Sequence, residues 1–133
     1  MPMTQANTRT VRDIDIRKES IVHEDLGIAV YEGGFYALAT ATGLVALPTN
    51  GAGQLSLGWA RSSAASGFPP PLFEYGHQEL VTFSAVATDV GKALYATSDN
   101  AFTTTAGSAT TPVGIIREIH SSTQCWVDTT LKA

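Results

Sequence analysis

The sequence predicts an all-β fold, a small β-barrel or β-sandwich with an extended N-terminal arm. Short apolar stretches recur from Leu26 to Val127, and clusters of Gly, Pro, Asn, Asp and Ser separate them at a spacing typical of all-β domains. No segment has the apolar period of a long amphipathic helix. At 133 residues the chain has the size of one ordinary domain, so the stretches are expected to share one body.

The predicted arm covers residues 1–25 and is unusually rich in charge. Residues 1–32 hold ten of the twenty Asp, Glu, Lys and Arg side chains of the whole chain. Within the arm, Val11–Ile16 alternates, with Ile14 and Ile16 on one face and charged residues on most of the other. This two-residue period predicts a half-buried strand.

Residues 26–133 form the predicted β-rich body. The pair Gly33 and Gly34 predicts a tight reversal, because glycine adopts positive φ at little steric cost. Arg61–Ser66 and Val86–Gly91 are expected to form short turns. Strands are predicted at Phe35–Ala39, Leu44–Leu47, Leu55–Ala60, Glu79–Ala85, Ala93–Ala96, Phe102–Thr105, Val113–Ile119 and Gln124–Thr130.

Glycine and proline mark special positions in this body. Gly58 and Gly114 each lie inside an apolar strand that follows an aromatic strand and a turn, which predicts a bulge or the close approach of another backbone. The similarity of the two segments is a loose internal repetition. Pro69–Pro71 cannot form an interior strand, so an extended surface segment is predicted there, as a connection in preference to a binding loop.

Charge and cysteine content exclude several functional classes. With 8 basic and 12 acidic residues the formal net charge is −4, which provides no basic surface for nucleic acid or an anionic membrane. No apolar run reaches the roughly 20 residues of a membrane span, and residues 1–7 lack a signal-peptide pattern. Cys125 is alone and cannot form an intrachain disulfide. A soluble protein made in a reducing cytoplasm is expected.

The sequence contains no recognisable catalytic motif. A nucleophile would need a base, and the chain offers only His23, His77 and His120, with no Gly-x-Ser-x-Gly elbow. Cys125 is expected to pack in the core. His77 and Glu79 could present two metal ligands on one strand face, but solvated side chains are favoured. No enzyme, cofactor or metal is predicted; a small hydrolase assembled only in three dimensions is the least favoured alternative.

Aromatic side chains offer a second possibility, a platform for sugars. Trp59 and Trp126 lie in apolar alternation, which favours the core for both. Phe68, Phe73 and Tyr75 flank the proline run and are expected to be more exposed. An exposed apolar patch there would mark a binding surface.

The second half of the chain resembles the decoration, or cement, proteins of tailed-bacteriophage capsids. The resemblance rests on Ala87–Thr105, in which Gly91 precedes the strand Ala-Leu-Tyr-Ala, the turn Ser-Asp-Asn and a Thr-rich strand. A Val-Gly-Ile-Ile strand at Val113–Ile116 and a final strand at Cys125–Asp128 complete it. The first half agrees more weakly through Gly34–Ala39 and Leu57–Ala60, and the whole resemblance covers about residues 26–131.

This resemblance implies a β-tulip-like body and a structural role in the virion. A cement protein decorates the capsid exterior, binds neighbouring copies of the major capsid protein and stabilises the head after assembly in the host cytoplasm. A homotrimer is the arrangement that the family implies. The alternative is a carbohydrate-binding module or adhesion domain on a phage surface.

The charged arm is the predicted partner-binding site. Ile14 and Ile16 could add an edge strand to a capsid subunit, and the mixed charges around them would select the partner. Alternatively the segment is the first strand of its own body. On the first interpretation, deletion through Ser20 is expected to leave the body folded and abolish capsid binding. The candidate residues are Arg9, Arg12, Asp13, Ile14, Asp15, Ile16, Arg17 and Lys18.

Overall fold

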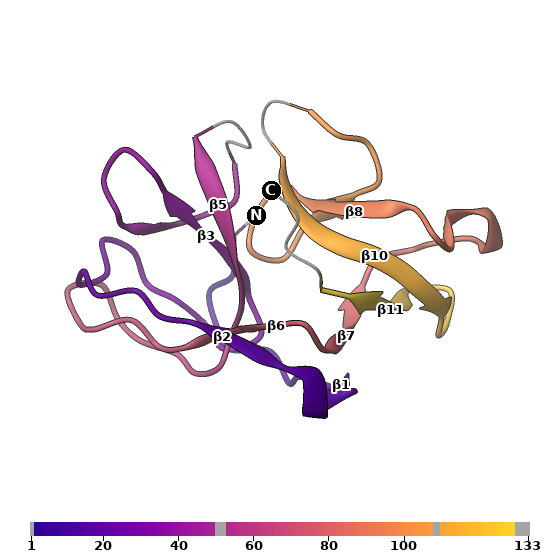
Figure 1. Cartoon of the computed structure of the whole chain (residues 1–133), viewed down its shortest axis with the longest axis horizontal. Coiled ribbons are helices and arrows are strands. Elements are labelled where there is room, and N and C mark those ends of the chain that lie inside the picture. Colours follow the sequence, from indigo (N-terminus) through magenta and orange to yellow (C-terminus); the bar gives the residue numbers. More distant parts are fainter. Residues whose placement is uncertain (1, 50–52, 108–109, 130–133) are drawn as a thin grey trace.

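The computed structural model, described here for residues 2–49, 53–107 and 110–129, confirms the all-β fold. Its strands form two antiparallel sheets, which we call sheet A and sheet B. Figure 1 shows sheet B on the left and sheet A on the right. The sheets are separate and do not close into a barrel, so the architecture is a sandwich.

In the described part of the chain, sheet A has six strands and sheet B has five. Two three-residue 3-10 helices, η1 (Ile14–Ile16) and η2 (Ala87–Asp89), lie between strands. In spatial order, sheet A consists of β1 (Val11–Arg12), β7 (Gln78–Thr82), β11 (Gln124–Asp128), β10 (Thr111–Ile119), β8 (Ala93–Ala96) and β9 (Phe102–Thr103). Sheet B consists of β2 (Lys18–Ser20), β6 (Phe73–Tyr75), β5 (Gln54–Ala60), β3 (Phe35–Ala39) and β4 (Val45–Ala46).

Most predicted strands of the body are present, with shifts at their ends. β3 and β8 have the predicted bounds, and a turn precedes β3 with Gly33 at φ 85°. β2 and β6 were not predicted, because Lys18–Ser20 is polar and Phe73–Tyr75 is only three residues long. The predicted strand at Glu79–Ala85 ends early, at Thr82. Thr130, the last residue of the final predicted strand, lies outside the described residues.

Two apolar clusters stabilise the sandwich. The first lies between the sheets and contains Phe35 and Trp59 from sheet B with Leu94, Ile116 and further residues from sheet A. The second lies on the other face of sheet B, where Tyr36, Leu57 and Phe73 pack against residues of the segment 22–30. Sheet B is therefore buried on both faces, which explains why the neighbouring residues Phe35 and Tyr36 are both fully buried.

The bulges predicted at two glycines are confirmed. The register of β3 on β5 shifts opposite Gly58, and the register of β10 on β8 shifts at Gly114. A Cβ atom on Gly58 would collide with the carbonyl oxygen of Glu74, and one on Gly114 with that of Asp128. Both glycines thus permit a close backbone approach that a larger residue would block.

Strand β6 continues into β7 and passes from one sheet to the other. Only Gly76 and His77 separate the two strands, and Gly76 has φ 88°. The N-terminal residues 2–20, which we call the strap, run antiparallel to this crossing. In the strap, β1 pairs with β7 at the edge of sheet A and β2 pairs with β6 at the edge of sheet B (Figure 1).

Candidate functional site

The strap turns a corner between its two strands, and this corner projects from the molecule. Asp13 adopts a left-handed conformation (φ 58°, ψ 40°), and η1 follows it. In the segment between β6 and β7, which faces the strap, a Cβ atom on Gly76 would lie 2.7 Å from the carbonyl oxygen of Ile16. Glycine at this position therefore lets the strap lie against the crossing between the sheets.

The prediction of a continuous strand over Val11–Ile16 is wrong beyond Arg12. The backbone N–H groups of Ile16 and Arg17 donate to the carbonyls of Asp13 and Ile14, which closes a 3-10 turn. The partner strands β7 and β6 belong to different sheets, so a strap that pairs with both must bend between them. The isoleucines consequently point outward, with Ile14 51% and Ile16 60% exposed.

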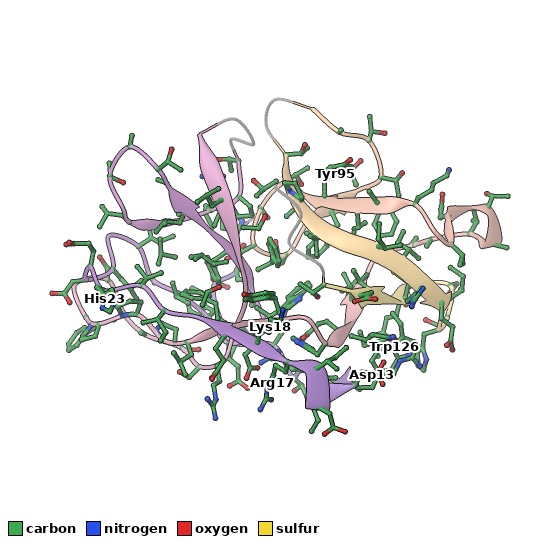
Figure 2. All side chains as sticks on the ribbon, in the orientation of Figure 1. Asp13, Arg17, Lys18, His23, Tyr95 and Trp126 are labelled. Atoms are coloured by element: carbon green, nitrogen blue, oxygen red, sulfur yellow. The ribbon has the colours of Figure 1, made fainter. Side chains whose placement is uncertain are left out.

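The outward corner is an apolar surface with charges on both sides, which we call the strap ridge (Asp13–Lys18). Every residue of the ridge is exposed. Figure 2 shows Asp13 and Arg17 in the lower part of the molecule, with Lys18 above them. Two acidic and two basic side chains therefore surround two exposed isoleucines, so the ridge offers apolar contact area and mixed-sign charge to a partner.

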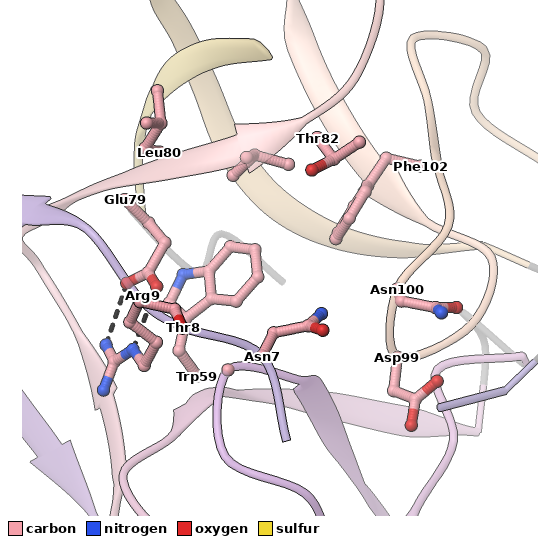
Figure 3. A pocket seen from close by; sticks show the side chains of 12 residues that line it. Asn7, Thr8, Arg9, Trp59, Glu79, Leu80, Thr82, Asp99, Asn100 and Phe102 are labelled. Atoms are coloured by element: carbon pink, nitrogen blue, oxygen red, sulfur yellow. Dashed lines mark hydrogen bonds and ion pairs between the residues drawn. The ribbon is translucent and has the colours of Figure 1, made fainter. Parts of the chain in front are cut away.

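Arg9, a predicted partner contact, points inward instead. Its guanidinium Nε and Nη2 lie 2.9 and 2.8 Å from Oε2 and Oε1 of Glu79 (Figure 3), and its Nη1 lies 2.7 Å from Oε1 of Glu74. Only 11% of the Arg9 side chain is exposed, and 3% of each glutamate side chain. Burial alone would lower the pKa of Arg9, but the hydrogen bonds and negative charges of Glu79 and Glu74 raise it above its ordinary value.

His77 completes this group, which we call the buried charge cluster (Arg9, Glu74, His77 and Glu79). The ring is fully buried, and its Nε2 lies 2.6 Å from Oε1 of Glu79. Two acceptors would repel each other at this distance, so we assign the proton to Nε2, which donates to the carboxylate. Nδ1 has no hydrogen-bond partner among the described residues.

The preference for solvated side chains at His77 and Glu79 was therefore wrong. The two residues do share one strand face, as their spacing indicates, but that face is directed into the protein and receives Arg9. Glu74 was not singled out from the sequence. Its only signal is a charge inside an apolar stretch, beside Phe73, which is itself buried although it was expected to be exposed.

Arg12 is also engaged within the molecule. Its guanidinium carbon lies 4.1 Å from the ring centroid of Trp126, its Nε is 2.6 Å from Oε1 of Gln78, and its Nη2 is 3.0 Å from Oε1 of Glu118. A cation–π contact of this kind fixes the side chain over the outer face of sheet A. Of the eight predicted site residues, the structure thus places six on the exposed ridge and turns Arg9 and Arg12 onto the body.

A small cavity lies between the strap and the sandwich (Figure 3). Its volume is about 60 Å3, and Asn7, Arg9, Trp59, Asp99 and Phe102 are among the residues that line it. Pockets for small organic ligands usually occupy about 300–1,000 Å3. This cavity therefore has room for water molecules but not for a sugar ring.

Another buried carboxylate, that of Asp99, lines this cavity. The Asp99 side chain accepts hydrogen bonds from the Tyr36 hydroxyl at 2.8 Å and from the backbone N–H of Met3 at 3.0 Å. Burial, together with the negative charge of Asp99, raises the pKa of Tyr36 above its ordinary value. The contact with Met3 ties the start of the strap to the body.

The aromatic residues do not form an exposed platform. Trp59 and Trp126 are buried, as expected, and Phe73 is fully buried. Tyr75 is half-buried in β6, whereas Phe68 is 62% exposed. Pro69–Pro71 lies outside the strands, as predicted, in the connection from β5 to β6.

The remaining candidates for chemistry are dispersed. His23 is exposed at one end of the molecule (Figure 2), and His120 packs edge-to-face against Trp126. Within residues 2–49, 53–107 and 110–129, no three His, Cys, Asp or Glu side chains are grouped to hold a metal ion. In the same part of the chain, no helix is long and apolar enough to cross a membrane.

Comparison of the chain with protein-family models, with curated proteins and with solved structures found no match.

Proposed function

We propose that this chain is a structural protein of a tailed-phage virion, which decorates the outer surface of the capsid and cements neighbouring major capsid protein subunits. The observation that carries the proposal is the strap ridge, a convex surface with Ile14 and Ile16 exposed among charges of both signs. Exposed apolar side chains grouped on one feature are typical of a protein contact. The resemblance of residues 26–131 to cement proteins supports the choice of a capsid protein as the partner.

The position of the ridge suits a protein that joins subunits. It lies where the chain crosses between the two sheets, on a strap that pairs with both. A partner that binds the ridge is therefore connected to both sheets of the sandwich. A homotrimer, which the resemblance implies, would present three such ridges. Linked contacts act together when their geometry permits simultaneous engagement, so weak individual contacts suffice for stable decoration.

The structure changes the expected mode of contact. A free arm could add a strand to a capsid subunit, but Val11–Arg12 and Lys18–Ser20 already pair within their own sheets. The edge strands β1, β2, β4 and β9 are only two or three residues long, which disfavours edge-to-edge pairing. We therefore propose side-chain docking of the ridge in place of strand addition.

Binding to phage heads that lack the protein tests this proposal. We expect the wild-type chain to bind the heads and to give density of its size on the capsid exterior in electron microscopy. The double variant Ile14→Ser/Ile16→Ser should bind at least about tenfold more weakly, because burial of the exposed half of each isoleucine contributes about 1 kcal/mol.

Leu55→Ser is the matched control, since Leu55 is 48% exposed in β5 and lies outside the ridge. The control variant should bind like wild type, and both variants should keep the wild-type melting temperature. Absence of wild-type binding, or density only on the tail, would reject the proposed function. Full binding by the double variant would reject the ridge as its site.

A further inference from the structure

The buried charge cluster connects the strap to both sheets at one point. Arg9 belongs to the strap, Glu74 to β6 of sheet B and Glu79 to β7 of sheet A. The guanidinium makes two hydrogen bonds to Glu79 and one to Glu74, all between 2.7 and 2.9 Å. The planar fork of arginine can satisfy this arrangement, whereas the single ammonium of lysine cannot.

The ridge is linked to the same cluster through Arg17. The Nε atom of Arg17 lies 3.2 Å from Oε2 of Glu74, whose other carboxylate oxygen binds Arg9. His77 lies on the same face of the segment as Glu79, donates to its carboxylate and holds that carboxylate toward Arg9. A displacement of Arg9 would therefore leave Glu79 with His77 alone and would disturb Glu74, the carboxylate next to Arg17.

The other attachments of the strap between Thr4 and Ser20 are short or lie near the surface, among them the Asn7 N–H that donates to the carbonyl of Glu32, the Thr10 carbonyl that accepts from Leu80, and the contacts of Arg12. Between Thr4 and Ser20, only Arg9, Val11, Arg12 and Ser20 are not exposed, and η1 contains no buried residue. β1 contributes two residues and β2 three to the sheets. Pairing this short does not by itself hold an edge strand in one place.

A buried ion pair is a poor source of stability but a strong determinant of position. Apolar residues of similar size would stabilise the same space as well or better, since desolvation offsets most of the attraction. An unpaired buried charge is strongly disfavoured, so any register of the strap that takes Arg9 away from the two glutamates is excluded. The cluster therefore selects one placement of the strap on the sandwich.

We infer that Arg9 is the positioning residue of the strap ridge: it holds the strap on Glu74 and Glu79 and so presents Ile14 and Ile16 to the partner without touching the partner itself. This inference rests on the proposed function for the identity of the partner. The seating of the strap can be measured on the isolated chain.

Trypsin cleavage after Arg17 and Lys18, followed by mass spectrometry, measures strap release. In Arg9→Met we expect the cleavage rate to rise by about a hundredfold, because removal of one partner of a buried ion pair is far more disruptive than loss of a surface pair. Amide protons of β10 and β11 should stay protected, which shows that the body remains folded. Arg9→Lys should give a smaller increase, and it replaces Arg9→Met in the comparison if that variant does not fold.

Arg61→Gln is the matched control for loss of an arginine near the same carboxylate. Arg61 is 53% exposed, with Nη1 2.9 Å from Glu19 and Nε 3.9 Å from Glu74. Exposed pairs contribute little, so strap cleavage in this variant should match wild type. Equal cleavage in Arg9→Met and wild type would overturn the inference.

A disulfide between the strap and the body can hold the strap in place when Arg9 is absent. It therefore tests whether Arg9 acts by positioning the strap or by a general effect on stability. Lys18 and Tyr75 are Cα partners in β2 and β6, at a spacing that a disulfide can bridge. The Lys18→Cys/Tyr75→Cys variant with Arg9 present is the reference, because it carries the same loss of Lys18 from the ridge, and its binding should not change with oxidation. Relative to this reference, Arg9→Met/Lys18→Cys/Tyr75→Cys should bind phage heads equally well when oxidised and more weakly when reduced.

The outcomes distinguish the two proposals. If wild type does not bind heads, the proposed function fails and docking by the ridge fails with it, while the cleavage comparison still decides whether Arg9 seats the strap. If the strap of Arg9→Met is released but heads are bound as by wild type, Arg9 has no positioning role in docking. If the oxidised disulfide variant has a protected strap and does not bind, Arg9 acts by some means other than position.

Discussion

Cys125 lies in the apolar cluster between the sheets, as its alternating sequence context predicts. Its side chain is fully buried among residues such as Trp59 and Val127. Burial, together with the negative charge of Asp89, raises the pKa of the thiol to about 11 from the ordinary value of 9.0. The thiol is therefore neutral at physiological pH and is shielded from reagents.

This shift predicts that the folded protein loses stability in alkali. In the unfolded chain the thiol ionises near its ordinary pKa, whereas in the folded chain it stays protonated until about 11. The free energy of unfolding should thus fall as pH rises from about 9 to about 11, by about 2 kcal/mol from this group. Urea unfolding at a series of pH values measures the loss.

Cys125→Ala should have a shallower loss than wild type between pH 9 and 10, whatever its stability at neutral pH. Tyr36, whose pKa is also raised by burial, adds a further loss above its ordinary value of 10.0 in both proteins. An identical pH slope in wild type and Cys125→Ala would show that the thiol is not protected by the fold.

At the scale of single elements, β10 shows how one residue shapes a strand. It is the longest strand, with nine residues, and it pairs with β11 on one side and β8 on the other. Gly114 lies at the irregularity in its pairing with β8, in van der Waals proximity to the backbone of Asp128. The absence of a side chain lets the neighbouring chain pass.

Gly114→Ala should therefore destabilise the protein. The added Cβ atom would collide with a backbone carbonyl that both strands hold in place, and overpacking of this kind costs about 1–3 kcal/mol. Gly107→Ala is the control, because a Cβ atom at Gly107 has no neighbour within 4 Å. Urea midpoints should fall for the first variant and stay near wild type for the second; equal midpoints would contradict the close approach.

Sequence and structure agree on the body more than on the strap. Alternation and turn residues predict β3, β5, β8, β10 and β11 because these strands have a buried face and clear breakers at their ends. The same alternation predicts a strand over Val11–Ile16, but the strand in the structure ends at Arg12. The strap bends after Arg12 because its partner strands β6 and β7 belong to different sheets. The sequence pattern of the strap contains no information about this arrangement of its partners.

The whole molecule combines two similar sets of strands. In sheet B the order is β4, β3, β5, and in sheet A the order β9, β8, β10 repeats it, with each central strand flanked by the two that follow it in the chain. Each set contains one of the bulged glycines. The loose repetition between the segments around Gly58 and Gly114 in the sequence thus corresponds to a repeated arrangement of strands.

The strap pairs with both sheets, so its removal should lower the stability of the whole molecule. Deletion through Ser20 removes β1 and β2 and leaves Glu74 and Glu79 buried without Arg9. Loss of one partner of a buried pair costs about 3–5 kcal/mol, a large part of the stability of about 5–15 kcal/mol of an ordinary domain. In contrast to the expectation from sequence, we predict that the deleted chain is severely destabilised.

Thermal unfolding of the deleted chain measures this effect, and Ile14→Ser/Ile16→Ser is the comparison that retains the strap. We expect a large decrease in melting temperature for the deletion and little change for the double variant, since the isoleucines are exposed. A deletion variant with the wild-type melting temperature would show that the arm is an independent appendage.

The sequence by itself determined the all-β class, the central strands, the glycine bulges and the burial of Cys125, Trp59 and Trp126. These features depend on the alternation of apolar and polar residues within short segments and on the steric requirements of single residues. Both can be read directly from the amino-acid sequence. Only the tertiary structure decided that Arg9 points inward to Glu74 and Glu79, and that the isoleucines of the arm point outward. The partners of Arg9 are at least 65 residues away in sequence, and a charge is buried only when distant opposite charges meet it, so the fold had to bring them together.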